Sequence, residues 1–131
     1  MAEYRFCYKK WKLGYAKNHA AYILREENYA SRKEELVYKE SGNMEMFDGT
    51  SAVKFWEYAD TYERANSVVY REIEVNIPNE FNHEQAKELI NNFVKKELGE
   101  KYIYTYAIHE SYNNDGEKNF HCHLMFSERE L

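Results

Sequence analysis

A chain of 131 residues, 44% of them hydrophobic and 17% aromatic, is long enough for one domain with a core, and its composition excludes a disordered protein. It contains no run of 18 apolar residues and no charged-then-apolar leader, so we expect neither a membrane span nor a secretory signal, and we expect a cytoplasmic protein. The net charge of −5 argues at first against a nucleic-acid partner.

The first part of the chain predicts a strand followed by a helix. The strand is expected over 4–9, and the helix over 18–27 with Asn18 as its N-cap. Residues 30–50 are weakly patterned apart from two predicted turns, at 41–43 and at 48–49. This stretch gives no element of its own.

The middle of the chain predicts a second helix and a second strand. Ser51 is expected to cap a helix over 51–65 that has a broad apolar face. Residues 68–77 then alternate as a half-buried strand. The alternation places Glu72 and Glu74 on the same face of that strand.

The last part of the chain predicts a third helix and a hairpin. Asn82 with Gln85 forms a capping-box signature, and the helix is expected to stop at Gly99. Strand-like runs over 102–108 and 120–126 flank a turn-forming segment, which predicts antiparallel pairing. The order of elements predicts an α+β protein whose antiparallel sheet carries helices mainly on one face.

The hairpin carries the most informative polar residues. His121 and His123 share one face of their strand, about 7 Å apart, and Cys122 points away. The hairpin would bring His109 beside them, and three histidines on adjacent strands predict a facial site for a divalent metal with open positions for a substrate. The histidine spacing alone also fits a polar surface pair.

The other histidines and the cysteines have simpler interpretations. His19 and His83 lie near predicted helix starts and are expected to be surface residues. Cys7 and Cys122 are too few for a disulfide framework and are expected to be small buried thiols.

Charge is distributed unevenly along the chain. Residues 1–33 hold eight Lys and Arg against three Asp and Glu, whereas the remainder holds ten against twenty. The basic residues alternate with aromatic ones, which suits a nucleic-acid single strand because phosphates attract cations and unstacked bases stack on rings. Candidate contacts are Arg5, Lys9, Lys12 and Arg25. A solvated basic edge with core aromatics is the alternative.

Five short stretches carry a likeness to a known family: AAYILRE at 20–26, ESGNM at 40–44, YERAN at 62–66, AIH at 107–109 and NFHCHLMFSER at 119–129. They follow one another in a consistent order over about residues 15–129. Together they resemble the MobA/MobL family of plasmid mobilisation relaxases.

The resemblance implies an HUH endonuclease that nicks and rejoins one DNA strand at an origin of transfer. By the family pattern Tyr22 is the nucleophile and forms a 5′-phosphotyrosine. His109, His121 and His123 would hold the divalent ion, Mn²⁺ or Mg²⁺. Tyr29 is the rival nucleophile, outside the matching motif position.

Glu72 or Glu74 would orient a ligand imidazole or accept a proton, unless they only face solvent. The expected partners are single-stranded origin DNA and accessory mobilisation proteins, and we expect a monomer. Residues 1–131 are expected to form a single relaxase domain, either excised from a longer protein or naturally short.

Two other classes share parts of this pattern. In rolling-circle replication initiators, the nearest alternative, the nucleophilic tyrosine follows the histidine motif, whereas Tyr22 precedes it here. A noncatalytic module that binds single-stranded DNA or a metal would keep the histidines but form no covalent adduct.

Overall fold

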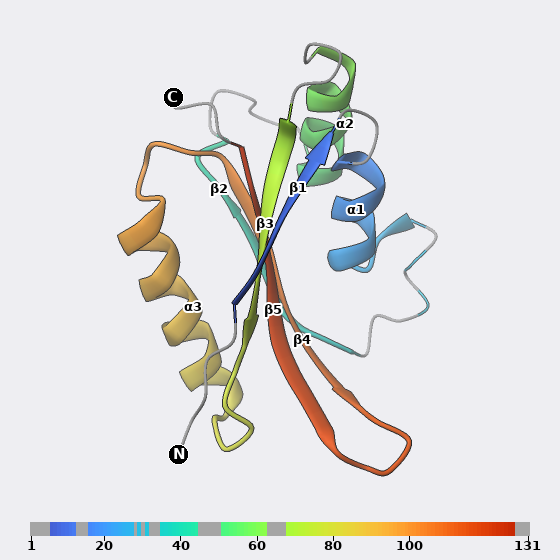
Figure 1. Cartoon of the computed structure of the whole chain (residues 1–131), viewed down its shortest axis with the longest axis vertical. Helices are drawn as coiled ribbons and strands as arrows, with labels where there is room; N and C mark the ends of the chain where they lie inside the picture. Colours follow the sequence, from blue (N-terminus) through green and yellow to red (C-terminus); the bar gives the residue numbers. More distant parts are fainter. Residues whose placement is uncertain are drawn as a thin grey trace.

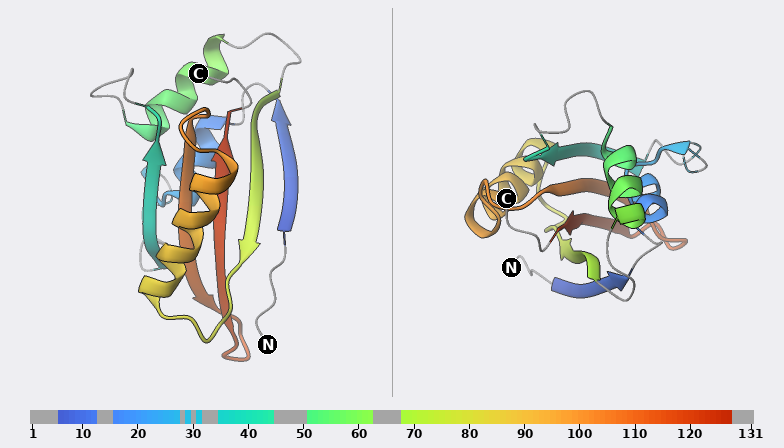
Figure 2. Two further views of the ribbon diagram at one scale, coloured as in Figure 1. Left: turned by 90° about the vertical axis from the view of Figure 1, so that its left-hand side faces the viewer. Right: turned by 90° about the horizontal axis from the view of Figure 1, so that it is seen from above.

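A computed structural model of the chain describes residues 6–12, 16–27, 29, 31, 35–44, 51–62 and 68–127. Within them, one antiparallel sheet holds five strands in the order β1-β3-β5-β4-β2 (Figure 2). The strands are β1 (Phe6–Lys12), β2 (Leu36–Gly42), β3 (Val68–Asn76), β4 (Tyr104–Tyr112) and β5 (Lys118–Phe126). This order puts the histidine-bearing hairpin β4–β5 in the middle of the sheet.

Three helices in the described residues cover the two faces of this sheet. The helices α1 (Ala16–Ile23) and α2 (Ala52–Tyr62) lie on one face, and α3 (His83–Glu97) lies on the other (Figure 1). The predicted α+β class with an antiparallel sheet is confirmed, and two of the three helices share a face. No helix of the described part is both long and apolar enough to cross a membrane.

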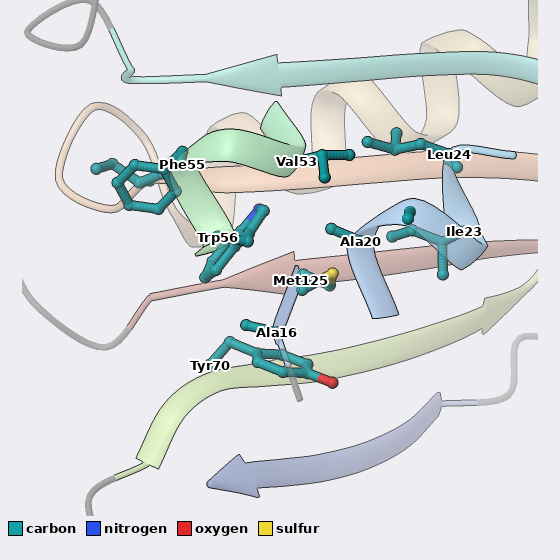
Figure 3. Close-up of a cluster of buried hydrophobic side chains, with 12 residues drawn as sticks. Ala16, Ala20, Ile23, Leu24, Val53, Phe55, Trp56, Tyr70 and Met125 are labelled. Atoms are coloured by element: carbon teal, nitrogen blue, oxygen red, sulfur yellow. The ribbon is translucent and has the colours of Figure 1, made fainter. Parts of the chain in front are cut away.

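The layer between α1, α2 and the sheet is built on Trp56 of α2 and Tyr70 of β3, which are both fully buried. Ala16 and Ala20 on α1 are small enough to let the helix backbone approach the strands. Figure 3 shows them facing Tyr70 and Met125 of β5, and all five residues belong to one buried cluster. This packing fixes α1 against the strands that carry the candidate site.

The opposite face is covered by α3, whose ends are formed by signals within its own sequence. Three buried apolar residues at four-residue spacing face the sheet: Ala86, Ile90 and Val94. The predicted capping box is present, with the Asn82 side chain accepting from the Gln85 N–H at 2.8 Å and the Gln85 side chain accepting from the Asn82 N–H at 2.9 Å. The predicted stop at Gly99 is confirmed by its φ of +55°, which glycine adopts readily.

The start of α1 differs from the prediction. The helix begins at Ala16, so Asn18 lies inside it and is not the N-cap. Instead, the carboxylate of Asp60 on α2 accepts hydrogen bonds from the backbone N–H groups of Ala16 at 3.2 Å and Lys17 at 2.9 Å. Because another helix supplies the cap, the sequence near the helix start contains no sign of it.

The strand β2 falls in the stretch that the sequence left without an element. A register shift between Leu36 and Tyr38 interrupts its pairing with β4, so Leu36 packs in the α1–α2 cluster while Val37 and Tyr38 both pack in the α3 cluster. The bulge therefore removes the alternation that identifies a strand. At its end, a Cβ on Gly42 would lie 2.3 Å from the Tyr104 ring, so any other residue there would displace that ring.

The remaining elements occur where the sequence predicts them, with ends shifted by a few residues. Ser51 caps α2 as predicted, because its hydroxyl oxygen accepts from the Lys54 N–H at 3.2 Å. The predicted turn at 48–49 and the predicted element ends at 4–5 and 63–65 lie outside the described residues.

Candidate active site

Three histidines converge on the face of the sheet that α1 covers. His109 of β4 and His121 of β5 are cross-strand partners, and His123 follows two residues later on the same face. Their ring centroids are 4.8–5.4 Å apart, and one ring nitrogen from each lies within 4.8 Å of the others. The predicted hairpin therefore brings the three predicted ligands together.

Of the three rings, His109 is the most buried, at 1% exposure, and it contacts α1 directly. Its Nε2 lies 2.6 Å from the Ile23 carbonyl oxygen, to which it donates, and its Nδ1 lies 3.4 Å from Nη2 of Arg25. Burial lowers the pKa of His109 to about 3 and that of His121 to about 4. Both imidazoles are therefore neutral near pH 7, the form that binds metal ions.

The donor set fits a divalent metal ion. His109 donates through Nε2, so its ligand lone pair is on Nδ1, where it accepts from Nη2 of Arg25 at 3.4 Å while no metal is bound. His123 donates from Nδ1 to Oε1 of Glu72 at 2.9 Å, which leaves its lone pair on Nε2. A ligand imidazole whose second nitrogen is held by a carbonyl or carboxylate has a fixed tautomer and orientation. Two of the three rings, His109 and His123, are held in this way. Three imidazoles on one face leave the other coordination positions open.

Glu72 of β3 is fully buried, which excludes the alternative that it only faces solvent. Its second oxygen, Oε2, lies 2.5 Å from Nε2 of His19. Burial raises the pKa of Glu72, but the hydrogen bonds from His123 and His19 outweigh it and bring the pKa to about 2. Glu74 is half-buried on the same face and lies across from His123 in the adjacent strand.

The prediction that His19 lies on the surface is wrong. Its side chain keeps 20% exposure, and its ring stacks on Tyr70 with centroids 5.7 Å apart. The expectation failed because the partner, Glu72, lies on a strand more than fifty residues along the chain. The sequence did contain one usable signal: His19 lies one helical turn before Tyr22 and so is on its side of the helix.

Tyr22, the predicted nucleophile, is half-buried on α1 between two residues that contact the histidines. The guanidinium of Arg25 lies 4.8 Å from its ring centroid, and the centroid of His19 lies 6.1 Å away. Arg25 contacts His109, and the ring of His19 lies 6.4 Å from that of His123. Tyr22 is thus one contact removed from the histidine cluster on each side.

Tyr29, the rival, packs edge-on against Tyr22 with centroids 5.3 Å apart. It is half-buried against the core that α1 and α2 form. Among the described residues, the aromatic ring that it contacts is that of Tyr22 and not a histidine ring.

Of the four basic residues predicted to contact DNA, the structure describes the side chain of Arg25. Arg25 is 4% exposed and belongs to the site, where its Nη1 donates to the Tyr22 carbonyl at 2.8 Å and its Nη2 lies 3.7 Å from Glu35. Arg5 and the side chains of Lys9 and Lys12 lie outside the described part of the chain.

The other candidate residues take no part in this site. His83 is exposed, as predicted, and its Nε2 lies 2.7 Å from Oε2 of Glu110. Cys122 is buried and free, and it packs on the α3 side of the sheet, where burial raises its pKa. The side chain of Cys7 lies outside the described residues.

Comparison with known proteins identifies relatives along almost the whole chain. The model of the MobA/MobL family matches residues 13–131. The chain is 44% identical over 131 residues to the 43 kDa relaxation protein of Salmonella typhimurium, covering 98% of this chain and 35% of that protein. It is 42% identical over 115 residues to mobilization protein A of Escherichia coli, covering 87% of this chain and 16% of that protein.

A solved structure shares the fold. It comes from work on the molecular basis of vancomycin resistance transfer in Staphylococcus aureus, and it superposes with a TM-score of 0.62 at 24% identity, covering 96% of this chain and 70% of that one. The chain spans about a third of the length of the first curated relative and about a sixth of the second.

Proposed function

The chain belongs to the MobA/MobL family, and on that basis we propose that it nicks and rejoins one strand of DNA at a plasmid origin of transfer. The observation that carries this proposal is the convergence of three histidines on the sheet face against which the helix of Tyr22 packs. A tyrosine one contact away from a histidine cluster that can hold a metal ion would supply the two parts that phosphodiester transfer needs, a nucleophile and charge neutralisation.

In the proposed step, Tyr22 Oη attacks the scissile phosphorus. The bond between phosphorus and Tyr22 forms, the bond between phosphorus and the 3′-oxygen breaks, and the tyrosyl proton passes to a base. The 3′-oxygen takes a proton and leaves as a free hydroxyl, while the 5′ end stays on Tyr22 as a phosphotyrosine. One phosphodiester replaces another, so the reverse attack rejoins the strand.

His109, His121 and His123 are the proposed ligands of the divalent ion. When bound, this ion neutralises and polarises a non-bridging oxygen of the phosphate. An all-imidazole donor set favours Mn²⁺ over Mg²⁺, which prefers oxygen ligands.

Glu72 is proposed to orient the metal centre. Its Oε1 holds the Nδ1 proton of His123, which keeps Nε2 available as a ligand. Both carboxylate oxygens of Glu72 already contact imidazoles. Glu74 is therefore the better candidate for accepting the proton of Tyr22.

The proposed setting follows from this chemistry. The substrate is single-stranded DNA, and accessory mobilisation proteins would present the origin. We propose that the chain acts as a monomer in the cytoplasm. Tyr22 precedes the histidine motif, which favours a relaxase over a rolling-circle initiator.

The first prediction tests the nucleophile. The Tyr22→Phe variant keeps the ring that packs against Arg25 and Tyr29 but loses the hydroxyl. Incubated with single-stranded origin oligonucleotides and Mn²⁺, the unmodified chain should form an adduct that survives denaturing electrophoresis. The variant should form none, while its affinity for Mn²⁺ stays within about twofold.

Tyr29→Phe is the matched control, because it removes a hydroxyl from the neighbouring ring. Tyr29→Phe should still form the adduct. EDTA should abolish adduct formation in both the unmodified chain and Tyr29→Phe. An adduct that persists in Tyr22→Phe and disappears in Tyr29→Phe would reverse the nucleophile assignment. If the unmodified chain forms no adduct on any origin strand, it is a noncatalytic binding module.

A further inference from the structure

Two imidazoles from different elements share one buried carboxylate. Oε1 of Glu72 lies 2.9 Å from Nδ1 of His123 on β5, and Oε2 lies 2.5 Å from Nε2 of His19 on α1. The side chain of Glu72 is 1% exposed, so these contacts take the place of water. The three residues therefore form a continuous polar connection from the helix of Tyr22 to the histidine cluster.

The contact with His19 covers the half of the carboxylate that His123 does not reach. Nε2 of His19 and Oε2 of Glu72 are both buried and meet at 2.5 Å, so an N–H on Nε2 faces the carboxylate oxygen in place of water. Without that donor, a buried carboxylate would keep one desolvated oxygen unpaired. Glu72 would then turn toward another donor or toward solvent, and its hold on His123 would weaken.

The position of His19 is itself fixed from two directions. Its ring stacks on Tyr70 with centroids 5.7 Å apart and planes 16° apart, so it cannot rotate freely. It also belongs to α1, whose Ala16 and Ala20 are fully buried against the sheet. A donor held this firmly selects one orientation of Glu72.

We propose that His19 is a positioning residue of the metal centre, acting through Glu72 to fix the tautomer and ring orientation of His123. The inference deepens the proposed function, and its metal-binding part rests on the proposed metal site. Since His19 lies three residues before Tyr22 on α1, the same contact ties the nucleophile helix to the metal-ligating strand. His19 need not touch the substrate for this role.

Two substitutions at His19 separate positioning from packing. His19→Ala removes the donor, whereas His19→Gln places an amide N–H where Nε2 lies and so should restore the contact with Glu72. The matched control is His83→Ala, which breaks a second His–Glu contact, of 2.7 Å, on an exposed surface. Melting temperatures of the metal-free proteins show whether each variant folds.

The first measurement needs no metal. Histidine ¹⁵N–¹H correlation spectra of the metal-free chain at pH 7.5 should show His123 as a single tautomer protonated on Nδ1. In His19→Ala that signal should shift toward an average of two tautomers, and His19→Gln and His83→Ala should retain it. A His123 signal unchanged in a folded His19→Ala variant would overturn the inference, even if the chain forms the covalent adduct.

The second measurement is calorimetric titration with Mn²⁺. His19→Ala should bind Mn²⁺ about 10- to 100-fold more weakly, the usual cost of losing an outer partner of a metal ligand. His19→Gln should recover most of that loss, and His83→Ala should match the unmodified chain. Equal affinity in His19→Ala and the unmodified chain would refute the role. An unmodified chain that binds no Mn²⁺ would refute the metal site, and the tautomer spectra would still decide the role of His19.

Discussion

Arg25 combines an unfavourable backbone with a buried charge. Its φ is +54° at the end of α1, where the Arg25 N–H donates to the Tyr22 carbonyl at 3.2 Å and the Glu26 N–H donates to the Ala21 carbonyl at 2.9 Å. This is a Schellman motif, in which glycine normally occupies the left-handed position. The strain is compensated by the contacts that the guanidinium makes with Tyr22 and His109.

Two substitutions of Arg25 should differ in their free energy of unfolding only because of the backbone conformation at this position. Arg25→Gly and Arg25→Ala both remove the guanidinium, but only glycine relaxes at positive φ, so Arg25→Gly should be more stable by about 1 kcal/mol. Urea unfolding measures the difference. At Glu88, an exposed position inside α3, the order should reverse and glycine should be the less stable by about 1 kcal/mol. An alanine variant at least as stable as the glycine variant at Arg25 would contradict the strain.

The sequence predicted residues of this site only where local spacing or a family motif identifies them. His121 and His123 are two apart in a strand, and a short turn brings His109 to them, so their meeting could be derived. His19 and Arg25 gain their roles from partners on distant strands. No neighbouring residue in the sequence indicates that they are buried, and Arg25 was predicted to contact DNA from its charge alone.

Among the elements, the structure separates those with local signals from those that depend on tertiary contacts. The helix α3 carries both parts of its capping box within four residues, and it was predicted from them. The start of α1 is defined by Asp60, 44 residues from Ala16, and the strand β2 by a bulge against β4. In both cases tertiary contacts define the element, so neither the start of α1 nor β2 can be predicted from the residues nearby in the sequence.

The cap of α1 is open to a direct test. Asp60→Ala should destabilise the protein by about 1–2 kcal/mol in urea unfolding, because it leaves two backbone N–H groups of α1 without an acceptor. The control is Glu57→Ala, about one turn earlier on α2, whose exposed carboxylate forms an ion pair with Lys17 at 3.4 Å. Such pairs contribute about 0–1 kcal/mol. Equal losses in the two variants would show that Asp60 acts through charge and not as a cap.

At the scale of the whole molecule, the site is assembled from one helix and three central strands. His109 contacts a carbonyl group 86 residues earlier in the chain, and Glu72 contacts a histidine 51 residues later. The sheet order places β3, β5 and β4 side by side, with α1 across them and with β1 and β2 pairing at the edges. The fold class could be predicted from the order of elements, but the packing of α1 on the histidines could not.

This assembly buries ionisable groups, so the stability of the metal-free protein should depend on pH. His109 and His121 have folded pKa values of about 3 and about 4, below the ordinary 6.5, and Glu72 has a folded pKa of about 2, below the ordinary 4.5. As pH falls below about 6.5, His109 and His121 bind protons in the unfolded chain but not in the folded chain. Below about 4.5, Glu72 also binds a proton in the unfolded chain first. The free energy of unfolding is therefore highest above about pH 6.5 and falls progressively toward pH 3.

Urea midpoints measured in EDTA should fall from pH 7.5 to pH 4, and His121→Asn should reduce that slope between pH 6.5 and 4. A protein that is more stable at pH 5 than at pH 7.5 would show that these rings are not buried in their neutral form.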